Sequence, residues 1–317
     1  MDKLFKKLIN AFAVCGREEE RAIVIKDFLT EKNIKFVEDK MGNILVKLGE
    51  GNEKLMITTH MDSIGLLATH IEEEGFIRAE KIGVFNSENF AYSAIKFKNG
   101  GRAKVSMGKK EEIFVDSGFS SRDEVLKKIK EGDSIAFLSE LIETNGRLIG
   151  HDLEASFGCF ILLNLINQSS ELNRETYFVF SVQHQEGGRG ARSAAFEINP
   201  DYAIILQGEE AGDRINGTGN IKLGAGPILS IMNKGLILHH NMKELVEAAA
   251  LQAKITLQYS VSKGNSDGGV VHKERGGVKT GVISIPIRYI STPSEMVALK
   301  DVETITQLLK SIVIKET

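Results

Sequence analysis

Three apolar runs of the sequence each lead into polar residues that are candidates for chemistry. They are residues 55–59 before His60 and Asp62, residues 177–182 before His184, and residues 202–206 before Gln207. Ligands of open α/β sheets bind at the carboxyl ends of the strands, so we expect these side chains to share one site. In the spacing His60-x-Asp62, the carboxylate can accept a hydrogen bond from the imidazole and fix which ring nitrogen faces a metal.

A fourth candidate is the run His151-Asp152-Leu153-Glu154, which directly precedes an expected helix at residues 157–167. An acid at a helix start is also stabilised by the helix dipole, so a structural role for Glu154 stays open. The sequence contains no GxSxG nucleophile elbow and no phosphate-cradling glycine loop. Chemistry of the α/β-hydrolase and P-loop types is therefore excluded.

Composition narrows the classes of partner. The 317 residues carry 40 Lys and Arg against 43 Asp and Glu, a net charge of −3. This balance favours neither nucleic acid nor an anionic membrane as partner, and the longest apolar runs are too short to span a bilayer. The two cysteines, Cys15 and Cys159, form no disulfide framework or CxxC pair. We therefore expect a cytoplasmic protein.

The elements that must position these residues fall into two patterns. Residues 1–64 and 149–317 alternate helical segments with apolar strands, which predicts a three-layer α/β domain. Residues 65–148 contain many short strands separated by Gly, Asn and charged turns, which predicts a small β-barrel-like domain. The predicted fold is thus an α/β domain interrupted by an inserted β domain.

Several longer motifs are spread along the whole chain. They are Cys15-Gly16-Arg17-Glu18-Glu19, Asp39-Lys40-Met41-Gly42-Asn43, Thr59-His60-Met61-Asp62-Ser63-Ile64-Gly65, Val115-Asp116-Ser117-Gly118-Phe119-Ser120-Ser121, Val182-Gln183 with Gly187-Gly188-Arg189-Gly190-Ala191, Ser266-Asp267, and Ile285-Pro286-Ile287-Arg288-Tyr289 with Pro293-Ser294-Glu295. In order and spacing they resemble those of the tetrahedral, or glutamyl, aminopeptidases, metallopeptidases that are also described as cellulase-like. The resemblance implies a peptidase domain with an inserted dimerisation domain, homo-oligomers from dimers up to twelve subunits, and peptides as ligands.

The same resemblance implies a site with two divalent metals, held by a His, a bridging Asp, a Glu, an Asp and a second His, beside a Glu that acts as general base. His60, supported by Asp62, matches the first His, and Glu154 takes the place of the bridging Asp. His184 stands where the base is expected. The remaining ligand positions are degenerate and are occupied by Gln185, Gln207 and Ser291.

These replacements predict that the two-metal centre is lost. The family pattern supplies three ligand carboxylates against four positive charges, whereas the matched positions here supply Glu154 alone. Gln and Ser are poor ligands for zinc-like ions. We therefore expect no cofactor, or one weakly held divalent metal, and little or no peptidase activity.

Two alternatives stay open. One is an active single-metal hydrolase that uses His60, Glu154 and His184, since two imidazoles and a carboxylate form a catalytic zinc set. Asp152 or Glu186 would then act as base. The other is an ordinary aminopeptidase whose ligands lie at residues other than the matched ones.

Overall fold

Four parallel strands form the middle of the molecule, in the order β12 (Glu175–Ser181), β3 (Lys54–His60), β13 (Tyr202–Glu210) and β16 (Lys279–Arg288). The computed structural model describes residues 2–169 and 171–314. The central strands are apolar and buried nearly throughout, as expected for parallel strands covered on both faces. Their carboxyl ends meet at one edge of the sheet.

Further strands extend this sheet on both sides. On the β12 side, β2 (Ile44–Leu48) pairs antiparallel with β12 and β1 (Val37–Glu38) pairs with β2. Beyond β16 the order continues with β17 (Glu295–Ala298), β11 (Arg147–Gly150) and β10 (Ile142–Thr144). β14 (Ile228–Met232) also pairs with β16, and β15 (Gln258–Val261) pairs with β14.

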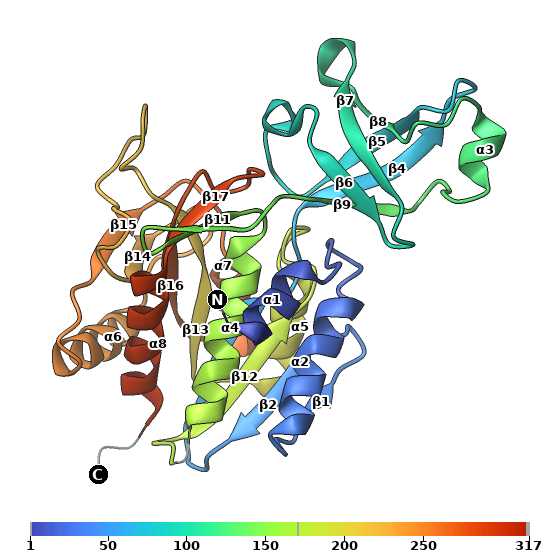
Figure 1. Cartoon of the computed structure of the whole chain (residues 1–317). Helices are drawn as coiled ribbons and strands as arrows, with labels where there is room; N and C mark the ends of the chain where they lie inside the picture. Colours follow the sequence, from blue (N-terminus) through green and yellow to red (C-terminus); the bar gives the residue numbers. More distant parts are fainter. Residues whose placement is uncertain (1, 170, 315–317) are drawn as a thin grey trace.

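Helices cover both faces of the sheet and make three layers (Figure 1). Alternate residues of a strand serve opposite faces, so Leu55 and Ile57 pack in one core and Met56 in the other. The first layer is formed by α1 (Lys3–Asn10), α2 (Glu19–Glu31), α4 (Leu153–Gln168), α6 (His240–Gln252) and α8 (Leu299–Val313), and the second by α5 (Arg189–Ile198), α7 (Gly268–Val271) and the turn η3 (Glu274–Gly276). In the described ranges 2–169 and 171–314, no helix has the length and apolar character needed to cross a membrane.

A separate closed barrel stands at one end of this sandwich (Figure 1). It follows the strand order β4-β5-β8-β7-β6-β9 and has its own apolar core. Its elements are β4 (Gly65–Ile71), β5 (Ile77–Ile82), η1 (Ser87–Phe90), β6 (Ala94–Phe97), β7 (Arg102–Met107), η2 (Lys109–Glu111), β8 (Ile113–Asp116), α3 (Arg122–Leu126) and β9 (Ser134–Phe137).

The predicted fold class, a three-layer α/β domain with an inserted small barrel, is confirmed. The predicted boundaries at 64/65 and 148/149 stay a prediction. Barrel pairing ends at Phe137, and β10 and β11 pair through β17 in the large sheet, so residues 142–148 lie with the sheet and not with the barrel. The sequence pattern could not separate them because short antiparallel strands look alike in either setting.

Arg21 ties α2 to the edge of the sheet where the strands end. Its side chain is fully buried and donates to the carbonyl oxygens of Leu8 (3.1 Å) and Met61 (2.7 Å). Its third partner is the carboxylate of Asp152, which precedes α4. One guanidinium therefore joins α1, the end of β3 and the start of α4, because its planar fork can donate in several directions at once.

We expect Arg21→Met to lower the free energy of unfolding by about 3–5 kcal/mol, because it leaves the Asp152 carboxylate without its buried partner. Urea denaturation followed by circular dichroism measures the change. Lys26→Met on the same helix is the matched control, since Lys26 pairs with Glu38 in solvent at 3.0 Å and its loss should cost at most about 1 kcal/mol. Equal losses in the two variants would contradict this role.

Candidate functional site

His60 ends β3 and is almost fully buried. Its Nδ1 lies 2.9 Å from the backbone carbonyl oxygen of Asp62, which can only accept, so Nδ1 carries the proton. The other ring nitrogen, Nε2, lies 3.5 Å from Glu154 Oε1 and has no hydrogen-bond partner in the described part of the chain. The expected bond to the Asp62 carboxylate is wrong, because the nearest carboxylate oxygen is 3.9 Å from Nδ1.

The Asp62 carboxylate is occupied elsewhere. It is fully buried, and its two oxygens accept the backbone N–H groups of His184 (2.8 Å) and Gln185 (2.9 Å). Asp62 therefore holds the loop that follows β12 against the end of β3. A second carboxylate, that of Glu18, accepts the N–H of Gln183 (3.0 Å), whose backbone is left-handed with φ 54°. The position of His184 is fixed by these two acids.

Glu154 lies in the first turn of α4 and faces His60. Its Oε1 also accepts the backbone N–H of Gly208 at 2.8 Å, which joins the start of α4 to β13. Burial on its own would raise the pKa of Glu154. The imidazole of His60, the charge of His184 and the Gly208 N–H outweigh burial and lower that pKa to about 2.

His184 is paired on one side and stacked on the other. Its Nδ1 lies 2.6 Å from the carboxylate of Asp267, and its ring stacks on that of His60 with centroids 4.0 Å apart and planes 15° apart. Burial opposes the charged imidazolium, but Asp267 first, then Asp62 and Glu154, outweigh it and raise the pKa of His184 to about 10. The same pair lowers the pKa of Asp267 against its burial. The ring is thus a cation between carboxylates.

The three neutral positions lie around this cluster. Gln185 and Ser291 line the same cavity of about 10 Å³ as His60 and Glu154, which is room for about one water molecule. Gln207 immediately precedes Gly208, and its buried Oε1 has no hydrogen-bond partner among residues 2–169 and 171–314. The structure therefore brings His60, Glu154, His184, Gln185 and Ser291 together and places Gln207 beside them.

The two candidate bases are both engaged. The carboxylate of Asp152 is bound to the guanidinium of Arg21. Glu186 turns toward the barrel and accepts the backbone N–H of Gly83 at 3.2 Å. Neither is placed by the described contacts next to the ring of His184.

Sequence reasoning gave no role to Asp267 or Glu295, although both stand in the quoted motifs. Glu295 is buried on the floor of the cavity and accepts the N–H groups of Leu153 (2.7 Å) and Ser291 (2.9 Å). Burial first, then the charges of Glu154 and Asp152, raise the pKa of Glu295 well above its usual range. The signal in the sequence was an acidic residue close to a glycine or a proline within a motif. That signal marks Asp267 and Glu295 but does not show which residues they contact.

The side chains of His60, Glu154 and His184 could hold a metal ion only if their ligand atoms pointed at one position. Zinc lies about 2.0–2.1 Å from an imidazole nitrogen and in the plane of the ring. The rings of His60 and His184 are stacked with nearly parallel planes, so one ion cannot lie in both planes at bonding distance. His184 Nδ1 is also held by Asp267. The ligand atoms of His60, Glu154 and His184 are within 4.8 Å of one another, but the arrangement does not fit a shared metal.

A second group of possible ligand atoms, those of Cys15, Glu18 and Asp62, also lies within 4.8 Å. The two carboxylates already accept backbone N–H groups, and burial first, then Asp62, raises the pKa of the Cys15 thiol. Because a metal binds the thiolate and not the thiol, this group fits an ion poorly. It serves instead to hold the loop at residues 183–188.

Comparison with known proteins places this site in context. The sequence profile of the M42 glutamyl aminopeptidases matches residues 42–308. The chain belongs to this family. A candidate aminopeptidase of Acetivibrio thermocellus is 33% identical over 98% of this chain and 97% of its own length. The family consists of metal-dependent peptidases.

Solved structures agree over the whole chain. Aminopeptidase APDkam598 from the archaeon Desulfurococcus kamchatkensis is similar with a TM-score of 0.93 and 29% identity, covering 99% of this chain and 94% of that one. The TET1 peptidase of Pyrococcus horikoshii, which can assemble into a tetrahedron or a large octahedral shell, gives a TM-score of 0.90 at 26% identity and covers 99% of both chains. The M42 fold is therefore kept from end to end.

We expect Asp267→Asn to destabilise the protein by about 1.5–3 kcal/mol, because it removes the charged partner of the part-buried imidazole of His184. Urea denaturation in the presence of a chelator measures this without interference from metals. The control is Glu274→Gln, whose partner Arg192 is largely in solvent and which should cost at most about 1 kcal/mol. If Asp267→Asn were neutral, the His184–Asp267 pair would not hold the site together.

Proposed function

We propose that this M42 protein has lost the two-metal peptidase centre and has little or no peptidase activity. The observation that carries the proposal is the state of His184, which is stacked on His60 and bound to Asp267 where the family pattern expects a glutamate base. The neutral side chains of Gln185 and Gln207 at expected ligand positions point the same way.

Charge balance supports this proposal. Two divalent ions bring four positive charges into a buried site and need carboxylates to offset them. At the matched positions Glu154 is the one carboxylate. It already faces His60 and receives the Gly208 N–H, and Asp267 is matched by His184. The cluster is therefore balanced by its own imidazolium, and little negative charge is left to hold ions.

The remaining roles follow from the family. We expect the protein to form homo-oligomers, from a dimer up to twelve subunits, as the assembling P. horikoshii TET1 peptidase suggests. The barrel would serve as the dimerisation domain. Peptides are the expected ligands, the expected location is the cytoplasm, and neither nucleic acid nor a membrane is an expected partner.

A second candidate is a hydrolase with one metal held by His60, Glu154 and His184. The closeness of their ligand atoms, within 4.8 Å, favours it. It requires His184 to leave Asp267 and to rotate out of its stack on His60. An ordinary aminopeptidase with other ligands is supported less, because the only other ligand group in the described ranges is the thiol and carboxylate set around Asp62.

Metal content and turnover test the proposal together. Protein purified without chelator should contain well under one zinc, cobalt or manganese ion per chain by elemental analysis. It should release no chromophore from a panel of aminoacyl p-nitroanilides with added Zn²⁺, Co²⁺ or Mn²⁺, beyond the rate of a His60→Ala control. Two tightly held ions per chain with turnover that His60→Ala abolishes would overturn it. One ion with turnover lost in His184→Ala would favour the single-metal alternative.

Restoring the family ligands should restore the metals. A variant with Glu154→Asp, His184→Glu, Gln185→Glu, Gln207→Asp and Ser291→His should bind close to two divalent ions per chain. Its aminopeptidase rate should exceed the wild-type rate by roughly a hundredfold, because metal ions supply several kcal/mol of transition-state stabilisation. The control keeps Gln185 and Ser291 and changes the other three positions, so it should bind metal more weakly. A folded five-residue variant that binds no metal would contradict the assigned ligand positions.

A further inference from the structure

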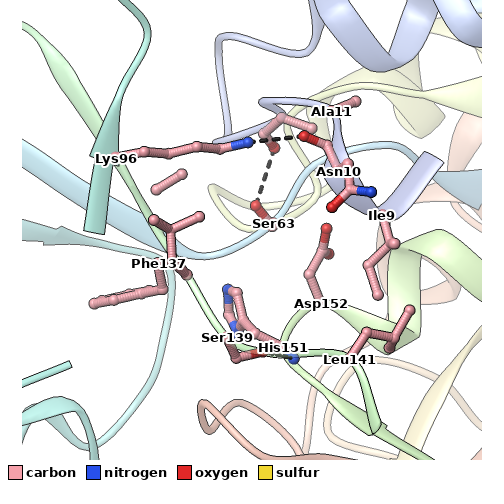
Figure 2. A pocket seen from close by; sticks show the side chains of 13 residues that line it. Ile9, Asn10, Ala11, Ser63, Lys96, Phe137, Ser139, Leu141, His151 and Asp152 are labelled. Carbon is pink, nitrogen blue, oxygen red and sulfur yellow. Dashed lines mark hydrogen bonds between the residues drawn. The ribbon is translucent and has the colours of Figure 1, made fainter. Parts of the chain in front are cut away.

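A second cavity, of about 60 Å³, lies next to the candidate site and shares the lining residues Ser63, His151 and Asp152 with it (Figure 2). It is enclosed by the end of α1, by the segment that enters the barrel after β3 and by the segment that leaves it after β9. This volume corresponds to roughly four water-sized positions. None of the matched metal-ligand positions lines it.

One side of the cavity offers acceptors. Asp152 gives one carboxylate oxygen to Arg21, and its other oxygen has no hydrogen-bond partner in the described ranges. His151 is 8% exposed, and its Nδ1 lies 3.3 Å from the carbonyl oxygen of Thr292, so Nδ1 carries the proton. Burial lowers the pKa of His151, which keeps the ring neutral. Nε2 is then a buried acceptor that lacks a partner among the described residues.

The opposite side offers a cation. Figure 2 shows Lys96, from β6, across the cavity from His151. Its Nζ donates one hydrogen bond to the carbonyl oxygen of Asn10 at 2.8 Å, and an ammonium has two further hydrogens to donate. Ser139 lies on the other side, beside His151, whose backbone N–H it accepts at 2.7 Å (Figure 2).

Apolar side chains complete the walls, among them Ile9, Ala13, Phe137 and Leu141. The cavity therefore combines one cationic end, one acceptor end and an apolar surface between them. A purely anionic ligand would satisfy Lys96 and leave His151 and Asp152 without donors. A purely cationic ligand would donate to His151 and Asp152 but would leave the ammonium group of Lys96 without an anionic partner.

We propose that this cavity binds a small free amino acid as its zwitterion, of the size of glycine or alanine. The ammonium group would lie toward Asp152 and His151, and the carboxylate toward Lys96. Binding at this cavity requires no metal and no peptide hydrolysis. It is therefore independent of the proposed loss of the two-metal centre.

Calorimetric titration of the full chain tests the proposal with four probes: glycine, alanine, propionate and ethylamine. Glycine and alanine should bind. Propionate and ethylamine each lack one of the two charges and should bind at least about tenfold more weakly, since a hydrogen bond to a charged group contributes that much or more. Propionate binding as tightly as alanine, or no alanine binding to the folded protein, would overturn the proposal and leave a cavity for water or a simple anion.

Variants locate the binding. Lys96→Met should weaken alanine about tenfold and leave ethylamine unchanged, whereas His151→Phe should weaken alanine and ethylamine and leave propionate unchanged. Lys104→Met, on the neighbouring strand β7 and exposed, is the control and should change nothing. Circular dichroism confirms that each variant is folded. If Lys96→Met bound alanine like the wild type, this cavity would not be the site.

Discussion

Buried charge at the carboxyl ends of the strands is the constraint on which the site depends. Asp62 is fully buried, and the hydrogen bonds that its carboxylate accepts from the N–H groups of His184 and Gln185 offset the cost of burying it. Its own carbonyl oxygen orients His60. One residue therefore fixes two imidazoles from two strands, and their stacking follows from the place where Asp62 holds them.

The scaffold does not depend on what occupies the site. The apolar faces of β3, β12, β13 and β16 pack against helices on both sides, and none of that packing involves the charged cluster. Arg21 adds a link between helices and strand ends through carbonyl oxygens and Asp152. The fold therefore does not require a particular set of side chains at the site, because stability and chemistry rest on different residues.

The sequence predicted this arrangement where local pattern controls it. Apolar runs that end in His60 and His184 placed those side chains at one sheet edge, and frequent short strands predicted the barrel. Pattern could not find the partner of His184, because Asp267 lies 83 residues further along the chain and the two meet through the packing of α7. The wrong expectation for Asp62 has a similar cause. Sequence spacing shows that a carboxylate can reach an imidazole, but not that backbone N–H groups compete for it.

Under the proposed loss of the metal centre, the side chains at the matched positions are coupled through their charges. An imidazolium at His184 beside Asp267 would repel divalent ions a few ångströms away, so a histidine there disfavours metals even where ligands remain. Without metals, carboxylates at positions 185 and 207 would add buried negative charge that one imidazolium could not balance, whereas the amides of Gln185 and Gln207 add none. Two combinations then balance the charge of the site. One has metal ions with carboxylates at positions 185 and 207, and the other has the imidazolium of His184 with the amides of Gln185 and Gln207. A site that takes some residues from one combination and some from the other has unbalanced buried charge. A replacement at one of these positions therefore favours replacement at the other positions.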